Sequence, residues 1–288
     1  MEEKVLVAGA SGALGLEVSK LLKEKNIPMR ALVHSSEGAS KVLPYTSDVW
    51  RADASEGTSE IKDITKGISL VISTMGQSVS LFSSHGNSFM EIDFFGNNNI
   101  LDDAKRNGVK RFVYVSIKGV DEGKDFRIAK AHKRFEDALR ASGIDHTIIR
   151  PVGFFSGLND LAIMAKRNVI PIVGSGEAKT NSIHQKDLAK FILNYLEDGP
   201  EMIEVGGPLV HTRLEMAEMV QEKIGGKIVK VPQKLADFGM ILPEMLNDDI
   251  SSKLSYFKFI TSNDMIGEKT GSITFKQYLD DLDLNDLP

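Results

Sequence analysis

The first half of the chain alternates short apolar runs with longer segments in which apolar residues recur at helical spacing. The apolar runs predict strands, and the amphipathic segments predict helices. Strands are predicted at Lys4–Val7, Met29–Val33, Asp48–Arg51, Leu70–Ser73, Arg111–Ser116 and His146–Ile149, with helices between them that include Phe89–Arg106 and Phe126–Ala141. Buried strands that alternate with helices form βαβ units, so the pattern predicts an α/β fold with a doubly wound parallel sheet.

The regular alternation ends at Pro151, and the predicted elements beyond it are shorter and separated by glycine and proline turns. They are helices around Leu158–Lys166, Asp187–Leu196 and Arg213–Lys223, and strands at Met202–Val205 and Ile228–Val231. We therefore divide the chain into a core at residues 1–151 and a smaller α/β lobe at residues 152–288, which packs against the strand ends. The acidic tail from Tyr278 to Pro288 predicts a solvated surface helix that frays.

A glycine-rich turn joins the first strand to the first helix, where residues 8–15 read AGASGALG. In this strand–turn–helix context the glycines predict dinucleotide binding. Gly9 permits the tight turn, Gly12 lets a pyrophosphate approach the backbone, and Gly15 lets the helix pack close to the strand. The helix N-terminus offers free N–H groups to the phosphates. The other residues of the turn, Ser11, Ala13 and Leu14, belong to the same predicted site.

Composition narrows the function classes further. The chain has 288 residues, 42% hydrophobic residues and a formal net charge of −5, so a binding role on nucleic acids is not expected. It contains no cysteine, which excludes disulfides and thiolate chemistry. Its six histidines show no ligand spacing on one element, and no metal site is predicted. Apolar runs stay short of the roughly 18 residues of a membrane span, and the charged start is not a signal peptide, so we expect a cytoplasmic protein.

Several blocks of sequence occur in the order typical of one superfamily. After the glycine turn come Val113–Ser116, Phe135-Glu136, Ser142-Gly143, His146–Pro151, Gly153–Phe155, Ile183-His184, Asp187–Ala189 and Gly206–Pro208. With these blocks the chain resembles the atypical short-chain dehydrogenase/reductases, in the NmrA-like, isoflavone-reductase-like and divinyl-reductase-like branch. The resemblance spans about residues 4–232. It implies a Rossmann core that binds NAD(P), and it does not fix a substrate.

The resemblance also places the adenosine end of the cofactor. The family usually ends its second strand with an arginine that binds the 2′-phosphate of NADP, and this chain has His34, then Ser35 and Ser36. The acid that would bind the ribose hydroxyls of NAD is also absent there, so we expect NADP, with NAD possible. Arg30, Lys41 or the two serines are candidates for the missing contacts, and His34 either takes part or has no ligand role.

Three further positions belong to the expected cofactor site by the same resemblance. Asp53 matches the family's adenine contact, although an aspartate there could equally cap the next turn. Gly76 follows the fourth strand where the family's backbone passes the cofactor, and turn geometry alone would also explain it. Pro151, which follows the sixth predicted strand, completes the set.

The catalytic pattern of the superfamily is incomplete here. The superfamily uses a serine, a tyrosine acid and a lysine four residues after the tyrosine. Ser116 fits the serine, but Ile128 and His132 occupy the tyrosine and lysine positions. His132 is either a general acid, because its unperturbed pKa is near neutrality, or a solvated helix residue. Lys118 either approaches the nicotinamide or is a surface lysine. The candidate catalytic residues are therefore Ser116, His132 and Lys118.

Two residue groups in the second half have a structural and a functional interpretation. Five large apolar residues either line an apolar substrate slot or belong to the core: Phe154, Phe155, Met164, Phe238 and Met240. Asp187 precedes a helical segment and is expected to cap it. The same family block also contains His184.

Two functions follow from these features. The first is an NADP(H)-dependent reductase of a small apolar organic substrate. The second is a non-catalytic NADP(H)-binding sensor or assembly factor that acts through a protein partner. The missing tyrosine and lysine favour the second, and a second lobe that would form a cleft favours the first. The oligomeric state stays open.

Overall fold

The computed structural model describes residues 4–80, 82, 88–123, 126–232 and 248–285. Its centre is a parallel sheet of eight strands in the order β12-β9-β6-β5-β4-β1-β2-β3. These strands are β1 (Val5–Ala8), β2 (Met29–Val33), β3 (Val49–Arg51), β4 (Leu70–Ser73), β5 (Arg111–Val115), β6 (Asp145–Pro151), β9 (Met202–Gly206) and β12 (Glu268–Lys269). The predicted doubly wound parallel sheet is confirmed, and the predicted strand ends lie within two residues of the observed ones.

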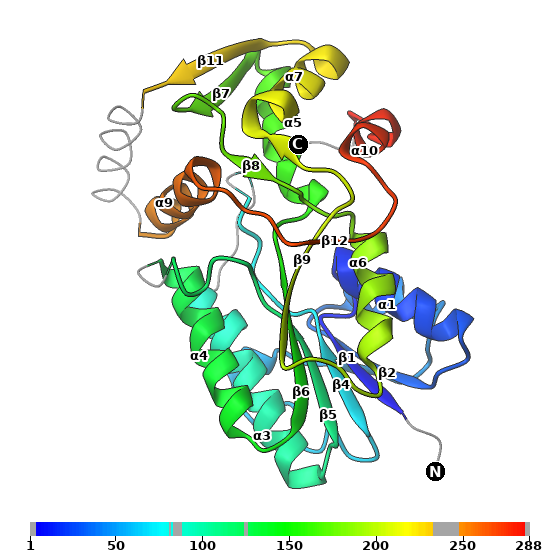
Figure 1. The fold of residues 1–288 in the computed structure, drawn as a ribbon. Coiled ribbons are helices and arrows are strands. Elements are labelled where there is room, and N and C mark those ends of the chain that lie inside the picture. The colour runs from blue at the N-terminus through cyan, green and yellow to red at the C-terminus, as the bar shows by residue number, and fades with distance from the viewer. Residues whose placement is uncertain (1–3, 81, 83–87, 124–125, 233–247, 286–288) are drawn as a thin grey trace.

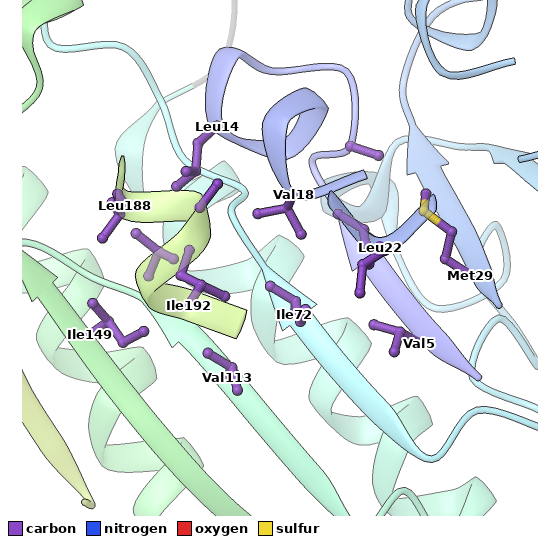
Figure 2. Packing of buried hydrophobic residues seen from close by; sticks show 14 of the residues in the cluster. Val5, Leu14, Val18, Leu22, Met29, Ile72, Val113, Ile149, Leu188 and Ile192 are labelled. Atoms are coloured by element: carbon purple, nitrogen blue, oxygen red, sulfur yellow. The ribbon is translucent and has the colours of Figure 1, made fainter. Parts of the chain in front are cut away.

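Helices cover both faces of this sheet (Figure 1). One face packs against α1 (Ala13–Glu24) and α6 (Gln185–Ile192), and the other packs against α3 (Asn97–Asn107) and α4 (Arg127–Ala141). Successive side chains of a strand point to opposite faces of the sheet, so the residues of one strand alternate between the two cores. In β5, Val113 points to the first face and Phe112 to the second. Figure 2 shows the first core, where Val18 and Leu22 of α1 lie over the strands beside Ile192 of α6.

The helix predicted at Phe89–Arg106 consists of two pieces with different winding. Met90–Gly96 forms a π-helical segment, η2, and α3 continues from it. The buried Asn97 lies at the junction, where its amide donates to the carbonyl of Asp93 at 3.0 Å and its Oδ1 accepts from Ser73 Oγ at 2.5 Å. π-helical turns are rare and occur frequently at functional sites. Sequence periodicity does not distinguish such a turn from an ordinary one.

A smaller layer lies beyond the carboxyl ends of the strands (Figure 1). Its core is formed by α5, α7, α10 and the parallel pair β7 and β11. The elements of this region are η3 (Phe155–Leu158), α5 (Asn159–Lys166), β7 (Val169–Val173), β8 (Lys179–Thr180), β10 (His211–Thr212), α7 (Arg213–Ile224), β11 (Lys227–Val231), α9 (Asp248–Ser262) and α10 (Phe275–Asp281). Shorter elements elsewhere are α2 (Ser36–Val42), η1 (Ala54–Glu56) and η4 (Leu193–Tyr195).

Two elements expected in the smaller lobe belong to the layer of the central sheet instead: one is a strand of the sheet, and the other is a helix on its face. The strand predicted at Met202–Val205 is β9, and it pairs with β6. The helix predicted at Asp187–Leu196 overlaps α6, which begins two residues earlier, ends at Ile192 and packs on α1. Strand pairing joins residues distant in sequence, so the local pattern gives the strand but not its partner. The chain beyond residue 151 therefore supplies both layers, and the two-unit division at that residue stays a prediction.

Local expectations about polar residues and the tail also need correction. Asp187 does not cap α6; His184 does, because its Nδ1 accepts from the backbone N–H of Lys186 at 3.0 Å. The Asp187 carboxylate instead accepts from the backbone N–H groups of Ser272 and Ile273, both at 2.8 Å. The tail begins in α10, where Leu279 is buried, so that part is not a solvated surface helix.

Within the described ranges, no helix combines the length and apolar character needed to cross a membrane. Across the same residues, no group of three His, Asp or Glu side chains has the geometry to hold a metal ion. Of the five apolar residues considered for a substrate slot, Phe155 is buried in the core of the smaller layer. Phe238 and Met240 lie outside the described residues.

Candidate functional site

A groove opens where the strand order of the sheet reverses, between β1 and β4. Ligands of doubly wound sheets bind at this place, outside the carboxyl ends of the strands. The groove has a volume of about 620 Å³ and is lined by the segments that follow β1, β2, β3 and β4. This volume lies within the usual range for a small-molecule or cofactor site.

The three glycines of the turn after β1 are required for different reasons. Gly9 has a φ of +74°, and a Cβ there would lie 3.0 Å from the backbone of Met75. A Cβ on Gly15 would clash with the carbonyl oxygen of Gly9 and lie 2.8 Å from the Cα of Ala10. Gly12 has an ordinary φ of −71°, and a Cβ there would touch only the Gly9 carbonyl oxygen at 3.3 Å. Gly12 is therefore the glycine whose missing side chain leaves space for a ligand.

The structure brings together most of the predicted cofactor residues. Seven of them line the groove: Gly9, Ser11, Gly12, His34, Ser35, Asp53 and Gly76. The lining does not include Ala13, Leu14, Gly15 or Pro151. Leu14 is buried in the core beneath α1, and Pro151 is buried at the end of β6. A direct cofactor contact by these four residues stays a prediction.

The end of the groove where the sequence predicts the adenosine is formed by the start of α2. Ser35 caps α2, because its Oγ accepts from the backbone N–H of Gly38 at 3.0 Å. Lys41 lines the groove as expected, but its Nζ pairs with Glu37 at 2.7 Å. This contact lowers the pKa of Glu37. Glu37 also lines the groove, and sequence analysis missed it although it stands in the first turn after the second strand.

Arg30 cannot supply the missing phosphate contact. Its Nε lies 3.1 Å from the Asp48 carboxylate, and its Nη1 donates to the carbonyl of Ile64 at 2.5 Å. Arg30 also stands near the start of β2, whereas the groove lies at the carboxyl ends of the strands. The expectation that included Arg30 was therefore wrong.

Asp53 and Gly76 combine structural roles with a place on the groove. The Asp53 carboxylate accepts from the backbone N–H of Ser55 at 2.8 Å and from its hydroxyl at 2.6 Å. Asp53 thus caps η1, as one interpretation held, and it also faces the groove. A Cβ on Gly76 would lie 3.0 Å from Oδ1 of Asp93, so the glycine lets the segment after β4 pass close to that buried carboxyl group.

Behind the Gly76 segment lies a buried polar network that the sequence did not reveal. Asp93 accepts from the backbone N–H of Gln77 at 3.2 Å. Its Oδ1 lies 3.3 Å from Nε2 of His132, and Nδ1 of that imidazole lies 2.6 Å from the hydroxyl of Tyr114. Burial raises the pKa of Asp93 to about 8 and lowers that of His132 to about 3. The imidazole is therefore neutral at pH 7.

His132 is not the solvated helix residue of one interpretation, because it is 4% exposed. It does not line the groove either, so its placement lends no support to the general-acid interpretation. Ile128, at the tyrosine position of the superfamily, is buried in an apolar cluster with Phe89 and Tyr256. At the position where the resemblance implies a tyrosine, the structure therefore has a buried apolar side chain.

Each of the other two candidate catalytic residues contacts a carboxylate. Ser116 is buried, and its hydroxyl donates to Oε1 of Glu136 at 2.7 Å. Glu136 is buried as well and binds Arg150 through two hydrogen bonds of 2.9 and 2.6 Å. Lys118 pairs with Glu204. Lys118 is therefore not a free surface lysine, and neither Ser116 nor Lys118 lines the groove.

Comparisons with known proteins agree with this geometry. Residues 9–199 match the NAD(P)H-binding family. The photosystem II assembly factor Ycf39 of Guillardia theta is 24% identical over 284 residues, which are 95% of this chain and 88% of that protein. The 40 kDa subunit of the mitochondrial NADH-ubiquinone oxidoreductase of Neurospora crassa is 25% identical over 244 residues, which are 80% of this chain and 63% of that protein.

Solved structures with the same fold include two reductases. The Escherichia coli NADPH-dependent quinone oxidoreductase QOR2, crystallised with NADPH, has a TM-score of 0.74 at 21% identity and covers 96% of this chain and 98% of its own. The Citrobacter triphenylmethane reductase, crystallised with NADP(H), has a TM-score of 0.73 at 20% identity and covers 96% and 99%. These likenesses confirm the expected fold. Because its family match covers most of the sequence, including the glycine turn, this chain belongs to the NAD(P)H-binding family.

Proposed function

We propose that this protein is an NADP(H)-dependent reductase of a small apolar acceptor. The proposal rests on the groove and a second cavity, which are lined by consecutive residues of one segment. Gln77 and Ser78 line the dinucleotide groove, and the next residue, Val79, lines a second cavity of about 60 Å³. That cavity is walled mainly by apolar side chains of the smaller layer, among them Leu161 and Ile172. A bound nucleotide and an apolar ligand would therefore share one wall.

The side chains near the sheet restrict the kind of acceptor. When bound, the reduced cofactor supplies a hydride, and the protein supplies binding, orientation and electrostatics. Simple ketones also need a proton during the reaction, and the superfamily's tyrosine would give it. Here Ile128 has no proton to give, and the Ser116 hydroxyl already donates to Glu136. We therefore propose acceptors such as quinones, whose reduced anion is stable enough to take its proton from water afterwards.

Turnover of matched acceptors tests this proposal. NADPH oxidation is followed with a benzoquinone and with an unconjugated cyclic ketone of similar size. General acid catalysis contributes about 10²–10⁴-fold, so the quinone should react at least about 100-fold faster than the ketone. Ser116→Ala should leave the quinone rate within about twofold. Ketone reduction at a comparable rate would show that a protein acid exists and would overturn this assignment.

A preference for NADP(H) over NAD(H) is part of the proposal. No carboxylate stands at His34, where an acid would repel a 2′-phosphate, and Lys41 lies on the groove. The family's arginine is absent, and Glu37 partly offsets Lys41. We therefore expect a small preference, which calorimetric titration with NADPH and NADH measures. Tighter binding of NADH would contradict it.

A second candidate is a nucleotide-binding assembly factor without turnover. It is favoured by the buried Ile128 and His132 at the positions where the superfamily has its tyrosine and lysine. Four relatives at 24–26% identity are named as photosystem II assembly factors. This candidate predicts NADPH binding without oxidation by either acceptor. It also predicts a protein partner whose affinity changes when NADPH replaces NADP⁺, which a pull-down from the native host with each nucleotide would measure.

A further inference from the structure

The cavity beside Val79 contains one cationic group with an unfilled hydrogen-bonding position. Arg213, the first residue of α7, lines the cavity, and its Nε is enclosed without a hydrogen-bond partner in the described residues. Its Nη2 donates to the carbonyl oxygen of Ile260 in α9, which is a neutral acceptor. Burial lowers the pKa of Arg213 to about 10, so the guanidinium is desolvated but still charged at pH 7. A buried donor left unpaired is costly, so a ligand acceptor would relieve this cost.

The charges around the cavity favour an anion. Two cations line it, Arg213 and Lys253, and one carboxylate, Asp160. Lys253 is buried and donates to the carbonyl of Ser80 at 3.2 Å, and Asp160 accepts from Ser80 Oγ at 2.5 Å. Both charged side chains thus have a polar contact with Ser80, whereas Nε of Arg213 has no partner in the described residues. The lining residues carry one net positive charge, and the Asp264 carboxylate, which interacts with Arg213, does not line the cavity.

The remaining lining residues indicate the size and the apolar character of the rest of the ligand. Leu158, Leu161, Ile172, Met216 and Ile260 offer apolar surface around the charged end. A space of about 60 Å³ is several times what one water molecule needs and suits a compact ring rather than a long chain. Apolar walls disfavour a doubly charged phosphate, because each charge would have to lose its water.

From this combination we infer that the cavity binds a compact apolar carboxylate, with Arg213 as the residue that holds the carboxyl group. The inference deepens the proposed function and rests on it for one step: the hydride acceptor would be a carboxylated ring compound. Binding itself needs no turnover. Arg213 is then a specificity-determining residue, because a planar guanidinium suits a carboxylate better than any neutral isostere.

Equilibrium binding tests the site without chemistry. Benzoate, its neutral isostere benzamide and inorganic phosphate are titrated into the full-length protein by calorimetry. Benzoate should bind at least about tenfold more tightly than benzamide, as expected for one charge-assisted contact. Phosphate should bind more weakly than benzoate. Equal affinity for benzoate and benzamide, or tighter binding of phosphate, would overturn the inference, and this wild-type comparison needs no variant to fold.

Two matched variants test whether Arg213 causes the preference for benzoate over benzamide. Arg213→Gln should reduce the preference for benzoate over benzamide to about twofold or less. Arg167→Gln, which changes an exposed arginine that lies over the ring of Phe82 outside the cavity, should retain it. If Arg213→Gln keeps the preference for benzoate, the carboxylate binds to another residue and the assignment is rejected.

Steady-state kinetics separates failure of this inference from failure of the proposed function. NADPH oxidation is compared for a benzoquinone carboxylate and its methyl ester. The acid should have a KM at least about tenfold lower at a similar kcat. Turnover of both quinones with equal KM would reject the inference and leave the reductase proposal standing. Arg213-dependent benzoate binding without oxidation of either quinone would reject the reductase proposal and leave the carboxylate site standing.

Discussion

The hydroxyl of Tyr114, a residue of the second core of the sheet, lies 2.6 Å from Nδ1 of His132. The sequence resemblance places His132 at the superfamily's lysine position, and in the structure the imidazole makes an interior contact. Burial raises the pKa of Tyr114 well above its ordinary value, and the nearby carboxyl groups of Asp93 and Glu136 raise it further. The phenol therefore stays protonated, and neither member of the pair lines the groove.

Gly12→Val should abolish tight nucleotide binding while the protein still folds. A Cβ at Gly12 meets only one atom, at 3.3 Å, so the backbone can keep its conformation. The side chain would occupy the space through which a pyrophosphate reaches the turn. Loss of two charge-assisted hydrogen bonds of about 1.5 kcal/mol each would weaken NADPH binding at least about 100-fold. Fluorescence titration of NADPH measures the change.

The glycine substitution has two matched controls. Gly157→Val, at a glycine where a Cβ meets no atom within 4 Å, should leave both fold and NADPH affinity unchanged. Gly15→Val should fail to fold normally, because its Cβ would clash with the backbone of the turn. Unchanged NADPH affinity in folded Gly12→Val would mean that the phosphates bind elsewhere.

Glu37→Gln should strengthen NADPH binding by about three- to fivefold and leave NADH binding unchanged. The substitution removes an exposed negative charge from the groove and releases Lys41 from its ion pair. The effect should shrink at high salt, because exposed charges are screened. Glu24→Gln, at the end of α1 and away from the groove, is the control. A parallel gain in NADH affinity would show that Glu37 does not face the 2′-phosphate.

Between pH 6.5 and 8, the free energy of unfolding of Asp93→Asn should fall less steeply with rising pH than that of the wild type. The pKa of Asp93 is about 8 in the folded protein and near 3.8 when unfolded, so the native state binds the extra proton between these values. Stability therefore falls as pH rises through this window, by about 1.4 kcal/mol per pH unit. The amide cannot ionise. Denaturant unfolding at each pH measures the slope, and an unchanged slope in the variant would contradict the assignment.

The same experiment isolates the opposite contribution of His132. Its pKa falls from 6.5 to about 3 on folding, so the unfolded chain binds the extra proton between these values. Stability from His132 is therefore present above pH 6.5 and is lost as pH falls toward 3. In the wild type this loss offsets the Asp93 contribution between pH 3.8 and 6.5. In Asp93→Asn it should become visible as a clear loss of stability below pH 6.5.

Glu136→Gln should destabilise the protein by about 3–5 kcal/mol, because it leaves Arg150 buried without its main carboxylate partner. Asp137→Asn is the matched control: the next residue is exposed, and its ion pair with Lys133 should contribute less than about 1 kcal/mol. Chemical denaturation of both variants gives the difference. Similar stability of the two variants would show that water or another group compensates Arg150.

The type and order of most elements, and the position of the candidate dinucleotide site, were predictable from the sequence alone. Apolar spacing is a local property, so the strand at Leu70–Ser73 was predicted with its observed ends. The turn at Gly9 was predictable because a positive φ excludes almost every other residue. Seven predicted cofactor residues line one groove, since the carboxyl ends of parallel strands meet at one edge of the sheet.

The contacts between distant side chains could not be predicted from the sequence. Asp93 and His132 lie on different helices, and their contact depends on how η2 packs against α4. Arg30 was a candidate phosphate ligand from the sequence, but in the folded chain it pairs with Asp48, which is distant in sequence. Arg213 showed no distinctive pattern in the sequence, because its unpaired Nε arises from the meeting of α7 and α9. Contacts between distant residues are set by the assembled core, which gives no periodic signal in the chain.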